Sequence, residues 1–201
     1  MGRHLVEAMV DTIVGAGVAL PGVNAEAETA ALFAGQWAER RKTPAMPLEG
    51  LRLYELVELS EVKLANGKLR QGVAADRELA TDWVRAFEAE AHTGGGRDPV
   101  VLVDGWIEAG QLWFWEDRQA VAMAAGRGPV EGVFRIGPVY TPPEFRGRGY
   151  GTACTYDLSR RILEQGGRPC LYTDLGNPTS NSIYRRIGYR AIAEWVRYRF
   201  G

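Results

Sequence analysis

Hydrophobic positions along the last two thirds of the chain recur with the periods of helices and strands. Apolar residues three or four positions apart, closed by glycine, predict helices that begin at Asp76, span 98–110 and 152–165, and run from the Asn177 cap to Gly188. Apolar runs predict strands over 69–73, 112–116, 120–125, 132–141 and 170–173, and from Gly188 to the end, with a turn over 126–129. The predicted fold class is therefore α/β (α+β), a mixed central sheet flanked by helices in the order β-α-α-β-β-β-α-β-α-β.

A smaller N-terminal αβαβ unit precedes this domain. Its predicted elements are a helix over 5–16, a strand over 18–20, a helix from the Asn24 cap to about Arg41, and a strand over 53–59. This order repeats the last four elements of the chain, so the unit is either a degenerate half of the same fold or a helical extension that supports the main domain. The predicted domains are 1–60, a polar linker over 61–68 with an Asn66-Gly67 turn, and 69–201.

Two local patterns refine the main domain. Leu79, Trp83 and Phe87 are spaced four residues apart, which predicts one buried stripe on the first helix. Gly137 and Pro138 interrupt the strand over 132–141. Because proline removes a hydrogen-bond donor from the sheet, this pair predicts either a bulge or a strand that pairs on one side only, and in both cases a partly free strand backbone.

The composition is that of an ordinary globular domain. The 201 residues are 46% hydrophobic and 24% charged, with 24 basic and 25 acidic side chains and a net charge of −1. This balance argues against a nucleic-acid partner. Glu7 and Asp11 interrupt the N-terminal apolar residues, and no apolar run approaches the roughly 18 residues of a membrane helix. We therefore expect a cytoplasmic protein that does not act at a membrane.

Cysteine and histidine are scarce in the sequence. Cys154 and Cys170 each stand among apolar residues, as buried thiols do in a reducing compartment, so a disulfide scaffold is excluded. His4 and His92 are far from any cysteine or carboxylate cluster with metal-ligand spacing. We expect no metal site.

A glycine-rich run, Arg146-Gly147-Arg148-Gly149-Tyr150-Gly151, links a predicted strand to a predicted helix. The free N–H groups and the positive dipole end of the helix favour an anion there, and the arginines can pair with phosphate oxygens. A Walker loop would need Lys and Ser or Thr, and a dinucleotide fingerprint would need glycine where Thr152 stands. The alternative is a glycine-rich turn without a ligand.

This run resembles the Arg or Gln, x, x, Gly, x, Gly or Ala signature of the GNAT-type N-acetyltransferases. Residues 177–189, Asn-Pro-Thr-Ser-Asn-Ser-Ile-Tyr-Arg-Arg-Ile-Gly-Tyr, look like the second cofactor-binding segment of that family. The resemblance covers about 69–201 and implies acetyl-CoA as the acyl donor. It further implies that Val139, Tyr140 and Thr141 contact the pantetheine, that 146–152 hold the pyrophosphate, and that Tyr184 faces the sulfur.

Helical spacing places three of the polar residues in this segment on one stripe. Asn177, Asn181 and Tyr184 fall at i, i+4 and i+7, whereas Ile183 and Ile187 face elsewhere. A polar stripe with one phenol suits the wall of a cofactor cleft, so Asn177 and Asn181 are predicted to bind the cofactor and Tyr184 to be catalytic. The alternatives are a helix cap for Asn177 and a core aromatic for Tyr184.

The implied reaction is direct attack of an amine, on a small molecule or a peptide, on the acetyl carbonyl, without a covalent enzyme intermediate. Backbone N–H groups near Val139 would stabilise the oxyanion, and Tyr184 would assist departure of the thiolate. The N-terminal unit would shape the acceptor side or a homodimer contact. Two other interpretations are a non-catalytic acyl-CoA-binding or sensor module and a nucleotide-dependent enzyme of another kind.

The acceptor side is not assigned by the sequence. Four acidic residues lie near predicted cleft elements, so none is named as the base: Glu108, Glu116, Glu131 and Glu144. The aromatic residues 113–115 either line an acceptor pocket or pack in the core. Arg185 and Arg186 either contact cofactor phosphates or interact with the helix dipole. The acceptor and the acyl chain length remain open.

Overall fold

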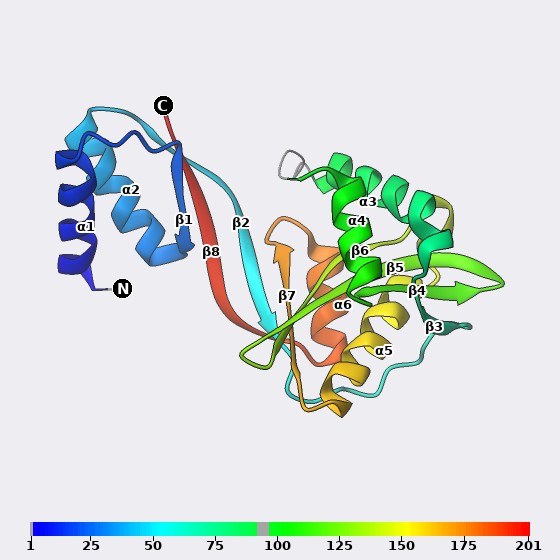
Figure 1. Cartoon of the computed structure of the whole chain (residues 1–201). Coiled ribbons are helices and arrows are strands. Elements are labelled where there is room, and N and C mark those ends of the chain that lie inside the picture. The colour runs from blue at the N-terminus through cyan, green and yellow to red at the C-terminus, as the bar shows by residue number, and fades with distance from the viewer. Residues whose placement is uncertain (1, 92–96) are drawn as a thin grey trace. The chain divides into compact units, whose positions relative to one another are not determined.

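The computed structural model describes residues 2–91 and 97–201, and His92 lies outside the described residues. The chain forms two compact units, whose elements are labelled in Figure 1. Unit 1 consists of Met1–Tyr54, Tyr172–Ser182 and Ala191–Gly201, and unit 2 consists of Glu55–Leu171 and Ile183–Arg190. Strand β7 (Arg168–Asp174) and helix α6 (Pro178–Ile187) contribute residues to both units.

Unit 2 is a mixed sheet with helices packed on it. Its helices are α3 (Arg77–Ala91), α4 (Pro99–Glu108), α5 (Tyr150–Glu164) and the end of α6. Its strands are β3 (Lys68–Gln71), β4 (Leu112–Asp117), β5 (Gln119–Val130), β6 (Val133–Tyr140) and the start of β7. They lie in the order β7-β6-β5-β4-β3, with β6 and β7 parallel and the other neighbours antiparallel.

Successive residues of β5 show which helices cover which face of this sheet. Ala125 belongs to a core cluster with Ala80 of α3 and Val103 of α4. A Cβ added to the next residue, Gly126, would lie 3.4 Å from the side chain of Leu158 on α5. Because neighbouring strand residues point to opposite faces, α3 and α4 cover one face and α5 the other.

Unit 1 contains α1 (Arg3–Gly15), β1 (Gly22–Glu26), α2 (Ala27–Arg41), β2 (Ala45–Glu55) and β8 (Arg190–Phe200). Its strands lie in the order β1-β8-β2, and β1 pairs antiparallel with β8. The rings of Phe33, Trp37 and Phe200 stack at centroid distances of 5.3 to 6.4 Å in the core of this unit. Arg197 and Arg199 alternate with this apolar face of β8 and are exposed.

The order of elements is confirmed throughout, but two N-terminal strands were misplaced. The predicted strand 18–20 is β1 at Gly22–Glu26, and the predicted strand 53–59 is β2 at Ala45–Glu55. Asn24 does not cap the second helix, because it lies within β1. Glu26 caps α2 instead, and its carboxylate accepts hydrogen bonds from the N–H groups of Glu28 and Thr29.

The predicted turn over 126–129 is wrong, because β5 continues through it to Val130. The chain turns instead at Glu131 and Gly132, whose φ angles are 49° and 76°. The predicted bulge in the next strand is confirmed, since Gly126 lies opposite Ile136 and Ala124 lies opposite Val139. The β6 segment 136–139 is therefore one residue longer than the β5 segment 124–126 that it faces, and Gly137 and Pro138 lie within it.

The predicted stripe on α3 is only partly buried. Trp83 is buried, but Leu79 is 38% exposed and Ala80 takes its place in the core. Asp76 precedes α3 without capping it, because its carboxylate binds the Arg70 guanidinium at 2.7 and 2.8 Å and accepts the Val73 N–H. These contacts fasten the end of β3 to the turn before α3.

The compact units cross the predicted domain limits of 1–60 and 69–201. The last strand, β8, pairs with β1 at the other end of the chain, with Gly22 opposite Arg199 and Glu26 opposite Trp195. This strand therefore belongs with the N-terminal elements rather than with unit 2.

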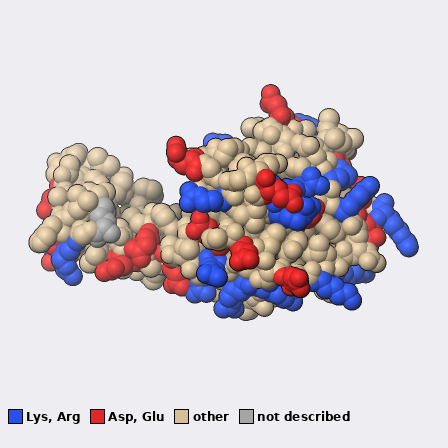
Figure 2. Space-filling model, turned by 90° about the horizontal axis from the view of Figure 1, so that it is seen from below, with Lys and Arg blue, Asp and Glu red and all other residues tan. Residues whose placement is uncertain are grey.

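Charged side chains of both signs occur across the face that Figure 2 shows, in keeping with a net charge of −1. Among the described residues, no helix combines the length and the apolar character needed to cross a bilayer.

Candidate active site

One edge of β6 is open where the strand approaches the glycine loop. Its parallel pairing with β7 runs from Val133 opposite Arg168 to Ile136 opposite Leu171. Gly137 and Pro138 follow, and beyond them the strand pairs with β5, Ala124 lying opposite Val139. The predicted pantetheine-binding stretch, Val139 to Thr141, is thus the end of a strand and the residue after it, and the second edge of this strand carries no strand pairing there in the described part of unit 2.

The glycine loop ends at the N-terminus of α5, as the sequence predicted. Gly147 and Gly149 adopt φ angles of 76° and 81°, and Gly149 is the residue before the first helical turn. A Cβ added at Gly147 would meet nothing within 4 Å, whereas one at Gly151 would lie 3.0 Å from Oγ1 of Thr141. Thr152 is buried in the first turn. The loop therefore brings bare backbone and a helix N-terminus to one place.

Arg146 does not extend from the loop toward a ligand. Its guanidinium donates to both carboxylate oxygens of Glu90 on α3, at 2.7 and 2.8 Å, and to the carbonyl oxygen of Thr141 at 2.9 Å. It also lies over the Tyr140 ring, with a distance of 5.7 Å from Cζ to the centroid. We infer that Arg146 holds the loop against α3, and that the backbone rather than this side chain is offered to an anion.

A hollow of about 430 Å³ lies beside the loop, lined among others by Phe145, Arg148 and Tyr150. Arg148 is exposed, so its guanidinium is at the rim of the loop. The Tyr150 hydroxyl donates to the Asp117 carboxylate at 2.6 Å, and this hydrogen bond raises the pKa of Tyr150. Tyr150 thereby anchors the start of α5 to the end of β4.

Tyr184 is buried in unit 2, with 9% of its surface exposed. Its ring meets that of Tyr189 edge to face at a centroid distance of 5.9 Å. Burial, and then the nearby Cys154 thiol, raise the pKa of Tyr184 to about 12. The phenol therefore stays protonated at neutral pH and carries a proton that it could donate.

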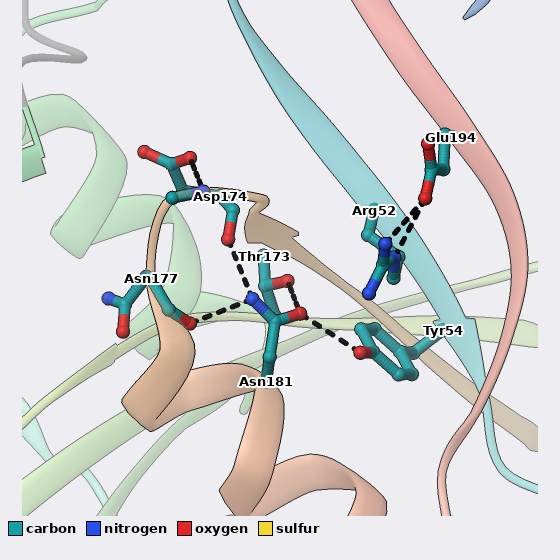
Figure 3. Close-up of polar contacts among 8 residues, drawn as sticks. Arg52, Tyr54, Thr173, Asp174, Asn177, Asn181 and Glu194 are labelled. Atoms are coloured by element: carbon teal, nitrogen blue, oxygen red, sulfur yellow. Dashed lines mark hydrogen bonds and ion pairs between the residues drawn. The ribbon is translucent and has the colours of Figure 1, made fainter.

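Asn181 occupies the polar cluster that Figure 3 shows, within unit 1. Its Oδ1 accepts from the Tyr54 hydroxyl at 2.9 Å and the Thr173 hydroxyl at 2.7 Å. Its Nδ2 donates to the backbone carbonyls of Asp174 at 2.9 Å and Asn177 at 2.7 Å. The amide is 4% exposed and fully engaged by protein groups, so the structure gives no support to its predicted cofactor contact.

Asn177 has the capping role that was its alternative interpretation. Its Oδ1 accepts the Ser180 N–H at 3.0 Å, and Pro178 takes the first helical position. In the same close-up Arg52 and Glu194 form an ion pair between the neighbouring strands β2 and β8. In α6, Asn177 and Asn181 therefore have structural roles, and Tyr184 remains the candidate catalytic residue.

We expect Asn181→Ala to lower the free energy of unfolding by about 2 to 4 kcal/mol, because it leaves the buried Tyr54 and Thr173 hydroxyls without their acceptor. The matched variant Asn177→Ala should cost about 1 kcal/mol, the usual value of a lost cap. Urea unfolding measures the stability, and calorimetry measures acetyl-CoA affinity. A Kd that changes less than threefold in folded Asn181→Ala is expected, and a large increase with unchanged stability would restore Asn181 to the ligand site.

Two site residues were missed from the sequence, Glu90 and Asp117. Glu90 binds Arg146 and Asp117 binds Tyr150, and both partners are far away in the sequence. No sequence motif indicates such a pair. Among the earlier acidic candidates, Glu116 is ion-paired with Arg70 at 2.5 Å. Phe114 and Trp115 are buried, which favours the core interpretation of the aromatic strand. Among residues 2–91 and 97–201, no group of three His, Cys, Asp or Glu side chains is arranged to hold a metal ion.

The family model described as FR47-like protein matches residues 116–200, which include the loop, α5 and α6. No curated protein matches the chain. Many solved structures share its fold. An acetyltransferase from the GNAT family of Colwellia psychrerythraea is 12% identical, with a TM-score of 0.72 over 99% of this chain and 72% of that chain.

A GCN5-related N-acetyltransferase from Kribbella flavida is 20% identical, with a TM-score of 0.64 over 99% of this chain and 76% of that one. The structure of AAC(6')-Iy in complex with the bisubstrate analog CoA-S-monomethyl-acetylneamine is 19% identical, with a TM-score of 0.50 over 63% of this chain and 92% of that one. At these identities the similarity establishes the fold and leaves the chemistry to the residues of the site.

Proposed function

We propose, from the GNAT acetyltransferase fold of this chain, that it transfers an acetyl group from acetyl-CoA to an amine. The observation that carries the proposal is that unit 2 contains the open edge of β6, the bare glycine loop at the start of α5 and the buried Tyr184. The first two suit an extended amide chain that ends in a pyrophosphate, and the third supplies a proton donor.

The residues fit coenzyme A by shape and by hydrogen-bonding capacity. Backbone N–H groups of 147–152 would hold the pyrophosphate, since those of the N-cap and first turn of α5 have no helical acceptors and those of 147 and 148 precede them in the loop. Backbone groups of Val139, Tyr140 and Thr141 on the open edge would pair with the pantetheine amides. Arg148 at the rim would add charge for the phosphates.

When bound, acetyl-CoA supplies the acetyl group as a thioester that an amine attacks directly, forming the N–C bond and breaking the C–S bond. Backbone N–H groups at the open edge near Val139 would donate to the developing oxyanion. Tyr184 would donate its proton to the departing sulfur and regain one from solvent. The amine loses its own proton to a base or to water.

A free-thiol release assay across a panel of amines tests this function. We expect acetyl-CoA to bind and at least one amine class to release CoA thiol, with the acetyl group recovered on that amine. Binding of acetyl-CoA with no thiol release for any amine, peptide or protein lysine would instead support a sensor module. Preferential binding of ATP or NAD over acetyl-CoA would exclude both.

A further inference from the structure

Two arginines lie directly opposite one another on neighbouring strands of unit 2. Arg127 on β5 is the register partner of Arg135 on β6. Like charges placed opposite each other in a sheet are destabilising, and natural sequences keep such conflicts mainly where function requires them. The pair therefore calls for an explanation in terms of a bound group.

Arg127 is also incompletely satisfied. Its Nε is buried and has no hydrogen-bond partner in the described structure. Burial, and then the charge of Arg135, lower the pKa of Arg127. A half-buried guanidinium beside a second one is stabilised by an anion that accepts from both, and a buried donor without a partner is a usual sign of an absent ion or water.

A third arginine lies near this pair, on the next strand of the sheet. Cys170 on β7 lies opposite Arg135, and the Arg168 guanidinium, two residues away, is 3.6 Å from the carboxylate of Glu55. Arg168 therefore brings a third guanidinium group close to Arg127 and Arg135 in this part of the sheet. A Cβ added at Gly126 would point toward Leu158 on α5. Because neighbouring strand residues point to opposite faces, Arg127 points to the face that α3 and α4 cover.

Arg127 and Arg135 lie close enough to the proposed reaction centre near Val139 to bind part of the same substrate. Arg135 and Val139 lie opposite Arg127 and Ala124, which are three residues apart on β5, or roughly 10 Å of strand at 3.3 Å per residue. Two long arginine side chains at one end of this interval and an amine at the other fit a substrate with a short spacer between its two polar ends.

We infer that Arg127 and Arg135 bind the acidic group of the acceptor, which is a primary amine that also carries a carboxylate or a phosphate several bonds away. Planar guanidinium groups pair with both kinds of oxyanion through two parallel hydrogen bonds. The inference rests on the proposed acetyl transfer and narrows its acceptor class.

Matched amines test this acceptor class. Amines with a terminal acid, 4-aminobutanoate, 6-aminohexanoate and 3-aminopropyl phosphate, are compared with butylamine, hexylamine and propylamine. For the wild type we expect kcat/KM to be about 10- to 100-fold higher for the acidic member of at least one pair, the usual value of one charged hydrogen-bonded contact. The carboxylate and phosphate arms show which anion the site prefers.

Arg127→Gln should remove this preference by raising KM for the acidic amine, while KM for acetyl-CoA stays unchanged. Its midpoint of thermal unfolding should stay the same or rise, because the like-charge contact is relieved. The matched control is Arg85→Gln on α3, where the exposed guanidinium pairs with Asp82, and it should retain the preference.

Calorimetric titration with glutarate and with inorganic phosphate separates this inference from the proposed function. Binding that is lost in Arg127→Gln, without acetylation of any amine, would support the anion site and reject the transferase. Acetylation of acidic and neutral amines at equal rates, together with no binding of either anion, would overturn the anion site and leave the transferase standing.

Discussion

Replacing Gly149 by Val is expected to weaken acetyl-CoA binding by about 100-fold, the loss of roughly two charged hydrogen bonds at the pyrophosphate. Gly149 has a φ of 81°, and a β-branched residue is strained in this region by about 1 to 2 kcal/mol. The loop would leave this conformation, and the N–H groups before α5 would no longer converge. Calorimetry with acetyl-CoA measures the effect.

Gly166→Val is the matched control, because Gly166 follows the other end of α5 with a φ of 76° and no atom within 4 Å of an added Cβ. The two variants should lose similar stability in thermal unfolding, but only the Gly149 variant should lose affinity. If both lost affinity equally, the effect would come from general destabilisation and the loop would have no special part in binding.

Tyr184→Phe is expected to lower kcat by about 100-fold while the Kd of acetyl-CoA changes little, the usual cost of a lost general acid. The ring and its edge-to-face contact with Tyr189 remain, so only the hydroxyl is removed. Because the pKa of Tyr184 is raised to about 12, the wild-type rate should show no loss from its ionisation below about pH 10.

Tyr189→Phe is the control for this experiment. The Tyr189 hydroxyl lies 2.7 Å from Oγ of Ser159, and Tyr189 is also buried, with 2% of its surface exposed, so the loss of this hydroxyl should reduce stability and leave kcat within a factor of three. Unchanged turnover in Tyr184→Phe would remove Tyr184 from the chemistry. A parallel fall of kcat in both variants would point to packing instead.

The glycine loop and the order of elements could be predicted because their signals are local. A glycine with positive φ, a proline at the first turn and a four-residue apolar spacing each act within a few positions of the chain. Gly149, Pro178 and the Gly137-Pro138 bulge have the roles that these signals predict.

The remaining features depend on partners far apart in the chain. The pairing of β8 with β1 joins residues near 22 to residues near 199, and Asn181 is held by Tyr54, 127 positions away. Helical spacing placed Asn181 and Tyr184 on neighbouring turns of α6, but it could not show that the amide was already engaged. The opposed arginines on β5 and β6 likewise depend on strand register, which the misplaced turn at 126–129 concealed.

A crystal structure of the protein with bound acetyl-CoA tests directly whether the glycine loop, the open edge of β6 and Tyr184 form one cofactor site. We expect the pyrophosphate at the backbone N–H groups of 147–152, the pantetheine along the open edge of β6 at Val139 to Thr141, and the sulfur within hydrogen-bonding reach of the Tyr184 hydroxyl. A cofactor bound elsewhere, or one whose sulfur lies away from Tyr184, would contradict it.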